Sequence, residues 1–299
     1  MNFNSIIEKA KSGEMKSIVV AAAQDSHVLG AVSEASSMGL VKPILVGNAD
    51  EIKKIIAEHS FKLEDAEIIH TDNDAMSAEV SVKMVAEGKA DVLMKGLLGT
   101  ATLLKAVLNK EWGLRTGNLL SHVGIIESKE SADKLYFLTD GAMVMYPDLN
   151  QKIGLINNAV KIARSFGIET PKVACIAAVE VVNPDMPATL DAAALTVMNQ
   201  RGQIKNCIVD GPLALDNAVS LEASQHKGIS SPVAGQADIL LVPNIESGNV
   251  LYKTSTYLGG CETAGLLAGA AAPIVLTSRA DSTASKLKSI ACAAVASQK

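Results

Sequence analysis

The chain has 299 residues, of which 48% are apolar, 20% are charged and only 3% are aromatic. This length is sufficient for two compact lobes, and a core of Ala, Val, Ile and Leu is typical of buried parallel strands covered by Ala-rich helices. The net charge of -5 is modest and the lysines are scattered along the chain, which excludes the basic surface of a nucleic-acid-binding protein.

The sequence contains no segment that predicts secretion or membrane insertion. Residues 1–16 carry several charged side chains and lack the apolar core of a signal peptide. The longest weakly polar stretch, Ala264–Thr277, is too short to span a bilayer and is interrupted by Gly265, Gly269 and Pro273. We therefore expect a cytoplasmic protein.

Short apolar runs rich in β-branched residues alternate along the chain with longer segments of helical period. The runs predict strands, in chain order, at residues 17–23, 43–46, 66–70, 90–94, 122–126, 134–138, 173–179, 207–209, 237–242 and 273–276. Apolar residues at intervals of three and four predict helices at residues 26–38, 75–87, 149–166 and 188–199. This alternation predicts an α/β fold with mostly parallel sheets and right-handed crossovers.

A strand that ends in a lysine and two glycines is the first candidate site. Within Met94–Ala101, Lys95 adds positive charge, Gly96 allows close approach of a ligand, and the amides of the following helix favour an anion. The segment contains neither the Gly-Lys-Ser/Thr of a Walker A loop nor a GxGxxG sequence. It predicts a phosphate-binding loop, and an ordinary turn between strand and helix is the alternative.

A polar segment at Pro243–Thr254 follows another apolar run and is the second candidate. Polar residues and glycine crowd it, and Tyr252 and Lys253 are adjacent near its end. Loops that follow buried strands often carry function. A capped turn with a solvated lysine explains the same residues, and the segment Val209–Asp216, which also ends an apolar run, is expected to be a turn.

The third candidate is Thr277–Ser282, between an apolar run and the closing helix. Arg279 offers a planar fork of donors suited to a phosphate, Ser278 offers a hydroxyl, and Asp281 offers an acceptor that could take a proton. An aspartate that caps the start of the closing helix is the alternative interpretation of Asp281.

The histidines, cysteines and serines argue against two other classes of site. The five histidines show no ligand spacing and the four cysteines lie far apart, so we expect no metal ion and unreactive thiols. The sequence Gly-x-Ser-x-Gly is absent, which argues against a serine hydrolase.

Read together in chain order, these segments resemble the phosphotransacetylase and phosphate butyryltransferase family, and they are most similar to its butyryl branch. The likeness covers essentially the whole chain, and the compact length also looks more like the butyryl branch than the longer acetyl branch. The segments that carry it are 90–96, 113–117, 179–184, 209–216, 231–235, Gly248-Asn249, 252–254 and Ser278-Arg279.

The resemblance implies two three-layer α/β/α lobes with an active-site cleft between them, the first of residues 1–126 and 274–299 and the second of residues 127–273. It also implies a homodimer or higher homo-oligomer, no metal, no permanently bound cofactor, and coenzyme A as a substrate. The residues that it assigns to phosphate or acyl phosphate are Lys95, Gly96, Thr100, Lys105, Asn249, Tyr252, Lys253 and Thr254, and those that it assigns to catalysis are Ser278 and Arg279.

Two positions depart from the family pattern. Relatives of the acetyl branch place an arginine where this chain has Lys105, which keeps the charge but loses the bidentate fork. The same relatives place a proton-accepting aspartate where this chain has Ser285. Asp281 is therefore the substitute candidate for the catalytic base.

The implied reaction is the reversible conversion of butanoyl-CoA and phosphate to coenzyme A and butanoyl phosphate. In a ternary complex, a base helps to deprotonate the coenzyme A thiol, the thiolate attacks the acyl phosphate carbonyl, and phosphate leaves. A phosphate acetyltransferase or a branched-chain variant is the alternative acyl specificity. A metal-dependent hydroxyacid dehydrogenase of related architecture and a non-catalytic protein that binds coenzyme A or acyl phosphate are the alternatives of other classes.

Overall fold

The computed structural model describes residues 1–130 and 133–298 of the chain. Two compact units make up the molecule: a terminal unit of residues 2–118 and 263–299, and a middle unit of Met1 and residues 119–262. The predicted lobes and the predicted cleft stay predictions, and residues 131–132 and 299 of those lobes lie outside the described residues. Within the described chain, no helix is both long enough and apolar enough to cross a membrane.

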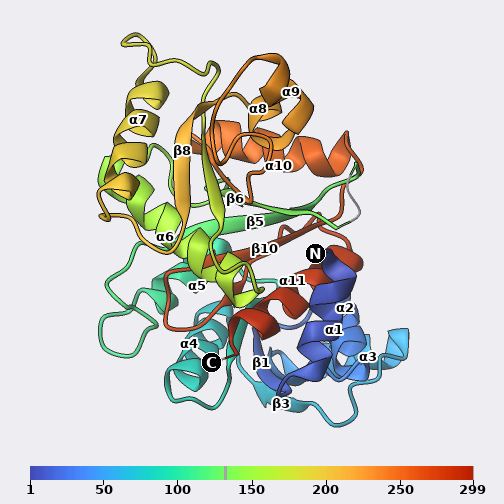
Figure 1. Cartoon of the computed structure of the whole chain (residues 1–299). Coiled ribbons are helices and arrows are strands. Elements are labelled where there is room, and N and C mark those ends of the chain that lie inside the picture. Colours follow the sequence, from blue (N-terminus) through green and yellow to red (C-terminus); the bar gives the residue numbers. More distant parts are fainter. Residues whose placement is uncertain (131–132, 299) are drawn as a thin grey trace. The chain divides into compact units, whose positions relative to one another are not determined.

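The terminal unit is built on six strands in the order β3-β2-β1-β4-β11-β10, of which β1, β3 and β10 are labelled in Figure 1. The strands are β1 (Lys16–Ala21), β2 (Val41–Gly47), β3 (Glu67–His70), β4 (Val92–Lys95), β10 (Thr263–Ala268) and β11 (Ile274–Val275). The pairings are parallel except for that of β10 with β11. Its helices are α1 (Phe3–Ser12), α2 (Ser26–Ser37), α3 (Ala49–His59), α4 (Asp74–Ala86), α5 (Thr100–Val107) and α11 (Thr283–Ala296).

The strand order of the terminal unit reverses between β1 and β4. The chain runs from β1 to β2 to β3 in one direction and then returns to place β4 on the other side of β1. Because crossovers between parallel strands are right-handed, α2 and α3 cover one face of the sheet and α4 covers the other. Strands β1 and β4 are thus enclosed on both faces, which explains their unbroken apolar runs; Val19, Val20 and Leu93 are fully buried.

The middle unit contains five strands in the order β5-β6-β9-β7-β8, of which β5, β6 and β8 are labelled in Figure 1. The strands are β5 (Ser121–Glu127), β6 (Leu135–Thr139), β7 (Lys172–Ile176), β8 (Ile208–Leu213) and β9 (Ile239–Leu241). Only the pairing of β5 with β6 is antiparallel among them. Its helices are α6 (Leu149–Ser165), α7 (Pro187–Gln200), α8 (Leu215–Val219), α9 (Leu221–His226) and α10 (Ile245–Tyr257).

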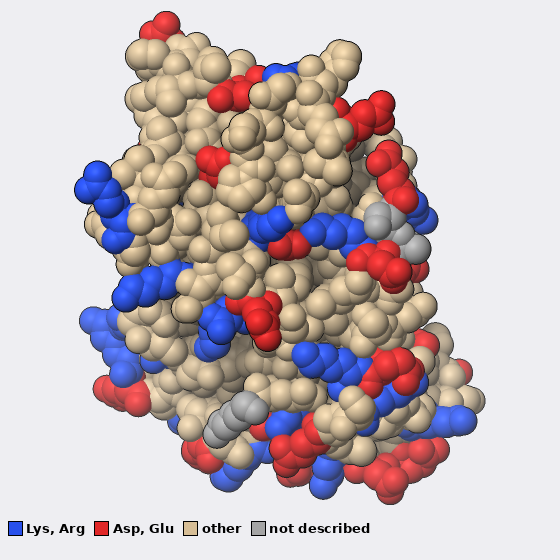
Figure 2. Space-filling view, in the orientation of Figure 1, with Lys and Arg blue, Asp and Glu red and all other residues tan. Residues whose placement is uncertain are grey.

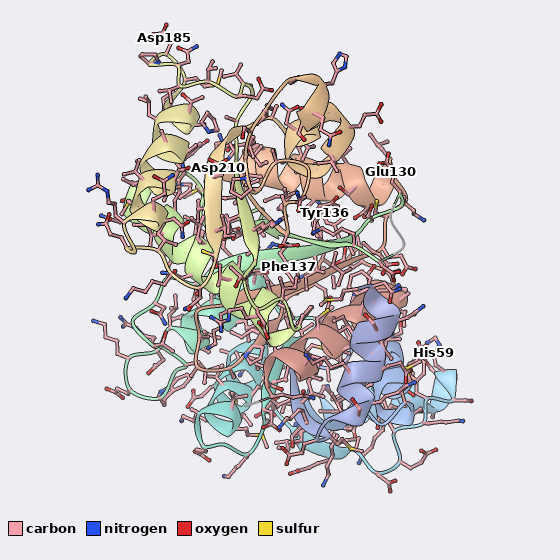
Figure 3. All side chains as sticks on the ribbon, viewed as in Figure 1. His59, Glu130, Tyr136, Phe137, Asp185 and Asp210 are labelled. Atoms are coloured by element: carbon pink, nitrogen blue, oxygen red, sulfur yellow. The ribbon has the colours of Figure 1, made fainter. Side chains whose placement is uncertain are left out.

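Strand β6 shows how the middle unit fills its core. Tyr136 and Phe137 are neighbours on this strand (Figure 3), so their side chains point to opposite faces of the sheet. Phe137 is fully buried and meets Phe166, at the end of α6, edge to face at a centroid distance of 5.5 Å. Tyr136 packs on the other face against the cluster that contains Leu240 and Val233.

Short polar side chains fix the starts of most of the helices. In each case a side-chain oxygen accepts a hydrogen bond from a backbone amide of the first turn, which satisfies a donor that the helix itself leaves open. The capping residues are Asn2 of α1, Asp25 of α2, Asn48 of α3, Asn73 of α4, Asp148 of α6, Asn244 of α10 and Ser282 of α11. Several of these capping residues, such as Asn244, were open to detection from the sequence alone.

Every strand and helix predicted from the sequence overlaps an observed element of the same type, which confirms the α/β class with mostly parallel sheets. Strand β10 and helices α1, α3, α8 and α9 were not predicted, and two segments were assigned the wrong type. Strand β10 was missed because Thr263–Ala268 is buried throughout and shows no alternation. Pro243–Thr254 was expected to be a loop, yet most of it is helix α10, and Val209–Asp216 was expected to be a turn, yet Asp210 lies on β8 (Figure 3).

We expect the closing helix to be essential for the stability of the terminal unit. Ile290 on α11 is fully buried, so Ile290→Ala removes apolar contacts and leaves a cavity, and it should destabilise the protein by about 2–5 kcal/mol. Denaturant unfolding followed by circular dichroism measures this change. Leu258→Ala is the control, because that side chain is 84% exposed. A loss at Ile290 no larger than at Leu258 would contradict the expectation.

Candidate functional site

Three segments of the terminal unit emerge at the same edge of the sheet, where the strand order reverses. Strand β4 pairs in parallel with β1, where Ala21 lies opposite Lys95, and with β11, where Val275 lies opposite Met94. The segments that follow these three strands therefore start side by side. In open parallel sheets, ligands bind at such a reversal, outside the carboxyl ends of the strands.

The turn after β4 is pressed against the end of β1. The Gly96 amide donates to the Ala21 carbonyl at 2.8 Å, and the Leu97 amide donates to the Ala22 carbonyl at 2.7 Å. A Cβ atom at Gly96 would lie 2.6 Å from the Ala21 carbonyl oxygen, so only glycine fits there. The turn leads into α5, which begins at Thr100 after a glycine that has no side chain to cap it.

Lys95 is the buried cation of this edge. Lys95 is only 6% exposed, and its Nζ donates a hydrogen bond to the Gly96 carbonyl at 3.1 Å. Burial lowers the pKa of Lys95 from its ordinary value of 10.5, and the positive charges of Arg279 and Lys286 lower it further, while Asp25 and Asp74 oppose the change. A bound anion would relieve this repulsion, so the arrangement favours an anion.

The segment after β11 brings a second cation to the Lys95 turn. Arg279 is exposed, and its Nη2 donates to the Leu97 carbonyl at 3.3 Å, which ties the guanidinium to the first loop. Ser278 is also exposed, and its hydroxyl oxygen accepts the Ala280 amide at 3.3 Å. The structure thus brings together Lys95, Gly96, Ser278 and Arg279, which are distant in sequence.

Asp281 is partly committed to the backbone. Its Oδ2 accepts a hydrogen bond from the Ser278 amide at 2.7 Å, so the carboxylate closes the short loop. The cap of α11 is instead Ser282, whose hydroxyl oxygen accepts the Ser285 amide at 3.2 Å. The alternative interpretation of Asp281 as a helix cap is therefore wrong, and the other carboxylate oxygen is the one that a ligand could use.

The remaining candidates of the terminal unit lie on α5. Thr100 is its first residue and half-buried, whereas Lys105 is exposed in its last turn. At a rise of about 1.5 Å per residue, the two Cα atoms are separated by about 7–8 Å along the helix axis. Thr100 is therefore part of the edge described above, and Lys105 can reach it only through its flexible side chain.

In the middle unit, the four predicted residues lie on α10. Asn249 Nδ2 donates to the Gly141 carbonyl at 3.0 Å, and Tyr252 meets His122 edge to face at 5.7 Å. Both side chains thus attach α10 to its own unit. Lys253 and Thr254 are exposed.

Sequence reasoning missed the residue that shapes the loop beneath α10. Asp140 is buried, and its two carboxylate oxygens accept hydrogen bonds from the amides of His122, Ala142 and Met143 at 2.7–2.8 Å. Gly248 of α10 packs directly on this loop, where a Cβ atom would lie 2.9 Å from Gly141 Cα. An acidic residue after an apolar run is a weak signal, because many acidic residues of the sequence follow such runs, and nothing in the sequence distinguishes Asp140 from the others.

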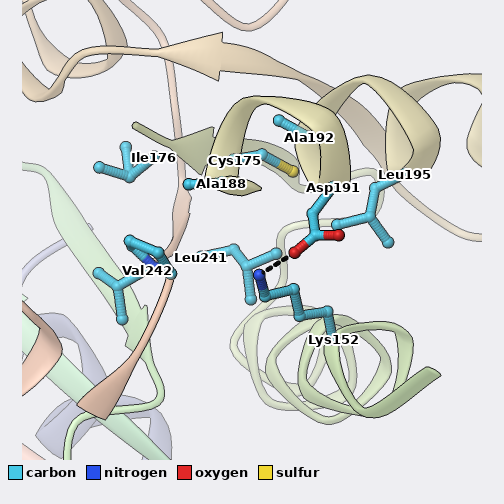
Figure 4. Close-up of a pocket in the computed structure, with 10 residues that line it drawn as sticks. Lys152, Cys175, Ile176, Ala188, Asp191, Ala192, Leu195, Leu241 and Val242 are labelled. Carbon is cyan, nitrogen blue, oxygen red and sulfur yellow. Dashed lines mark hydrogen bonds and ion pairs between the residues drawn. The ribbon is translucent and has the colours of Figure 1, made fainter. Parts of the chain in front are cut away.

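A second set of charged and sulfur groups lines a small cavity in the middle unit (Figure 4). Lys152 of α6 and Asp191 of α7 form an ion pair at 2.5 Å, and the Lys152 side chain is 6% exposed. Burial raises the pKa of the adjacent Cys175 thiol to about 12, so it stays protonated. The space is about 10 Å³, enough for roughly one water molecule, which makes this a structural contact rather than a substrate site.

The surface charge agrees with the absence of a basic stripe. On the face shown in Figure 2, lysines and arginines are interspersed with aspartates and glutamates. Across residues 1–130 and 133–298, no cluster of three His, Cys, Asp or Glu side chains is arranged to hold a metal ion. The β1–β4 edge presents two cations, Lys95 and Arg279, and the Ser278 hydroxyl, an arrangement that would suit a small oxyanion.

Comparison with known proteins agrees with this chemistry. The model of the phosphate acetyl/butaryl transferase family matches residues 2–82 and 75–294. The chain is 55% identical over 294 residues to the phosphate butyryltransferase of Clostridium acetobutylicum, with 98% of this chain and 97% of that protein covered. It is 45% identical over 295 residues to the phosphate acetyltransferase of Thermotoga maritima, with 99% of each covered.

A solved structure shows the same architecture. The crystal structure of a branched-chain phosphotransacylase from Enterococcus faecalis matches with a TM-score of 0.83 and 34% identity, and the match covers 95% of this chain and 99% of that chain.

We expect the affinity for inorganic phosphate to depend on the protonation of Lys95. Because the pKa of Lys95 is lowered, its ammonium loses the proton at a lower pH than the 10.5 of an ordinary lysine, so affinity should fall as the pH rises toward 10.5. Lys95→Met should weaken binding at least about tenfold at neutral pH and flatten this dependence. Isothermal titration with phosphate measures both.

Lys83→Met is the matched control, because Lys83 belongs to the same unit and is paired with Glu79 on α4. Equal phosphate affinity in wild type and Lys95→Met would contradict the expectation.

Proposed function

Because the chain belongs to the phosphate acetyl/butaryl transferase family, we propose that it transfers a short acyl group, butyryl in first place, reversibly between coenzyme A and inorganic phosphate. The observation that carries this proposal is the pairing of Lys95 with the Ser278-Arg279 loop at the strand reversal. Those groups provide the charge and the donors that a phosphate needs. The preference for butyryl rests on the 55% identity to the clostridial enzyme.

The reaction is a direct exchange of the acyl group. In one direction, the coenzyme A thiol loses its proton, the thiolate sulfur bonds to the carbonyl carbon of the acyl phosphate, and the carbon–oxygen bond to phosphate breaks with its electron pair on the departing oxygen. An ordinary thiol has a pKa of about 8.5, so nearby positive charge increases the thiolate fraction at neutral pH. Lys95 and Arg279 supply that charge.

Arg279 and Ser278 have complementary roles in this proposal. The guanidinium neutralises the charge that gathers on phosphate as it leaves, and its fork suits two phosphate oxygens. The Ser278 hydroxyl accepts the Ala280 amide, so its own hydrogen points elsewhere and can donate to the oxygen of the tetrahedral intermediate. Asp281 would accept the thiol proton through the oxygen that does not hold the Ser278 amide.

The remaining candidates fall into two groups. Gly96 and Thr100 would bind phosphate through the start of α5, and Lys105 would add charge from its last turn. Asn249 and Tyr252 are held by contacts within their own unit, so we assign them to the support of α10. Lys253 and Thr254 are exposed beside them and are the α10 groups that could meet the acyl phosphate.

We also propose which ligands the protein holds, where it acts and how it assembles. Coenzyme A is bound as a substrate and no cofactor is held permanently. The chain acts in the cytoplasm as a homodimer or higher homo-oligomer. Light scattering coupled to size-exclusion chromatography measures the oligomeric state. A monomer at the concentration used for the activity assay would overturn the proposed homo-oligomer but not the proposed reaction.

The acyl preference needs its own experiment. The branched-chain phosphotransacylase and the acetyltransferase named above make isobutyryl and acetyl the specific alternatives to butyryl. One methylene in an apolar pocket is worth only about 1–3 kcal/mol, so the preference is a ratio of rates. Phosphate-dependent thiol release from acetyl-, propionyl-, butyryl- and isobutyryl-CoA measures it. A protein that binds coenzyme A but releases thiol from none of them is a sensor and not an enzyme.

We expect Arg279→Ala to lower kcat/KM for phosphate at least about tenfold, because the departing phosphate loses its bidentate partner. Steady-state thiol release from butyryl-CoA measures the change, and circular dichroism checks the fold. Arg201→Ala is the control, because Arg201 is exposed after α7 in the middle unit. Near wild-type rates in Arg279→Ala would refute the role of the guanidinium.

A further inference from the structure

Lys286 is a buried cation that the reaction described above does not use. It lies in the first turn of α11 and is only 3% exposed. Its Nζ donates to the main-chain carbonyls of Ser278, at 3.1 Å, and of Asp281, at 2.6 Å. Both bonds reach back across the start of the helix to the Ser278–Asp281 loop.

These two hydrogen bonds attach an otherwise exposed loop to a buried helix. Ser278, Arg279 and Ala280 are all exposed, whereas α11 is buried along most of its length. Within the loop, the Asp281 carboxylate accepts the Ser278 amide and the Ser278 hydroxyl accepts the Ala280 amide. Because Lys286 binds the carbonyls of Ser278 and Asp281, at the two ends of the loop, it holds the backbone that carries the Ser278 and Arg279 side chains.

The charge of Lys286 also acts on the anion site. Burial lowers the pKa of Lys286, while Asp281 of the loop and Asp25 of the α2 cap raise it. Its positive charge in turn lowers the pKa of Lys95 on β4, beside that of Arg279. An ammonium buried against main-chain carbonyls is costly to desolvate, and such placements are typical of functional sites.

We propose that Lys286 is a positioning residue for acyl transfer, which holds the Ser278–Asp281 loop so that Ser278 and Arg279 lie beside Lys95 at the anion site. This inference rests on the proposed function, because the loop is assigned its role there. Lys286 acts through Arg279 and Ser278 and need not touch the substrate. Small displacements of a binding group are enough to lower a rate by one or two orders of magnitude.

The test compares Lys286→Met with Lys288→Met, a lysine two residues further along the same helix, whose Nζ lies over the Phe3 ring at 5.8 Å from its centroid. Lys286→Met keeps most of the length of the side chain and removes both hydrogen bonds and the charge. We expect it to lower kcat/KM for phosphate at least about tenfold, with KM for butyryl-CoA changed less than about threefold. Lys288→Met should behave as wild type.

A double-mutant cycle separates positioning from a general effect on the fold. If Lys286 acts through Arg279, the effect of Lys286→Met should shrink to less than about threefold in an Arg279→Ala background. An undiminished effect in that background would overturn the proposal, as would wild-type kinetics in Lys286→Met alone. Should Lys286→Met fail to fold, Lys286→Gln replaces it; because its amide can still donate hydrogen bonds, a smaller loss is expected, and that loss should likewise shrink in the Arg279→Ala background.

Amide hydrogen exchange measures the stability of the Ser278–Asp281 loop independently of catalysis. In the protein without substrates, Lys286→Met should exchange the amides of residues 278–281 faster than wild type, with no such change in Lys288→Met. Unchanged exchange would overturn the positioning role whatever the kinetics show. If wild type itself releases no thiol from any acyl-CoA, the proposed function fails while accelerated exchange still supports the contact between Lys286 and the loop.

Discussion

The interaction on which the candidate site depends is the repulsion among cations placed at one edge of a sheet. Lys95 ends β4, Arg279 follows β11, and Lys286 lies beneath the Arg279 loop. The pKa of Lys95 is lowered because its ammonium is buried near the other two charges. These positive charges would favour an anion at the position where the strand order reverses.

Buried lysines of the described chain differ in how their charge is balanced. Lys152 in the middle unit is paired with the carboxylate of Asp191, so that site is close to neutral. Lys95 and Lys286 instead donate to main-chain carbonyls, which satisfy hydrogen bonds but leave the net charge uncompensated. The second arrangement leaves positive charge that an incoming phosphate could use, which supports the proposed site at the β1–β4 edge rather than at Lys152.

Backbone geometry makes this edge possible. The amides of Gly96 and Leu97 bind the carbonyls at the end of β1, and the absence of a side chain at Gly96 lets the two strand ends approach. The same logic holds α10 in the middle unit, where Gly248 packs on the loop shaped by the buried Asp140 carboxylate. In both units, a glycine at a close approach positions polar side chains that the chain would otherwise leave to solvent.

The sequence by itself determined the class of the fold and predicted the chemical character of the candidate site. Apolar runs and helical periods are local properties, so the strands and helices that they predicted are present, and Lys95, Gly96, Ser278 and Arg279 were recognisable because lysine, glycine and arginine after buried strands suit an oxyanion. Helices α1, α3, α8 and α9 were not predicted. Strand β10 and helix α10 were not recognised, because burial on all sides removes alternation and a polar helix resembles a loop.

Only the tertiary structure decided which residues meet. That β11 lies beside β4, and so brings Arg279 to the Leu97 carbonyl, depends on a pairing between segments about 180 residues apart, which no local pattern encodes. The commitment of one Asp281 oxygen to the Ser278 amide and the burial of Lys286 under that loop are likewise set by packing. The physical reason is that burial and charge repulsion depend on distance in space, whereas propensity and periodicity depend on distance along the chain.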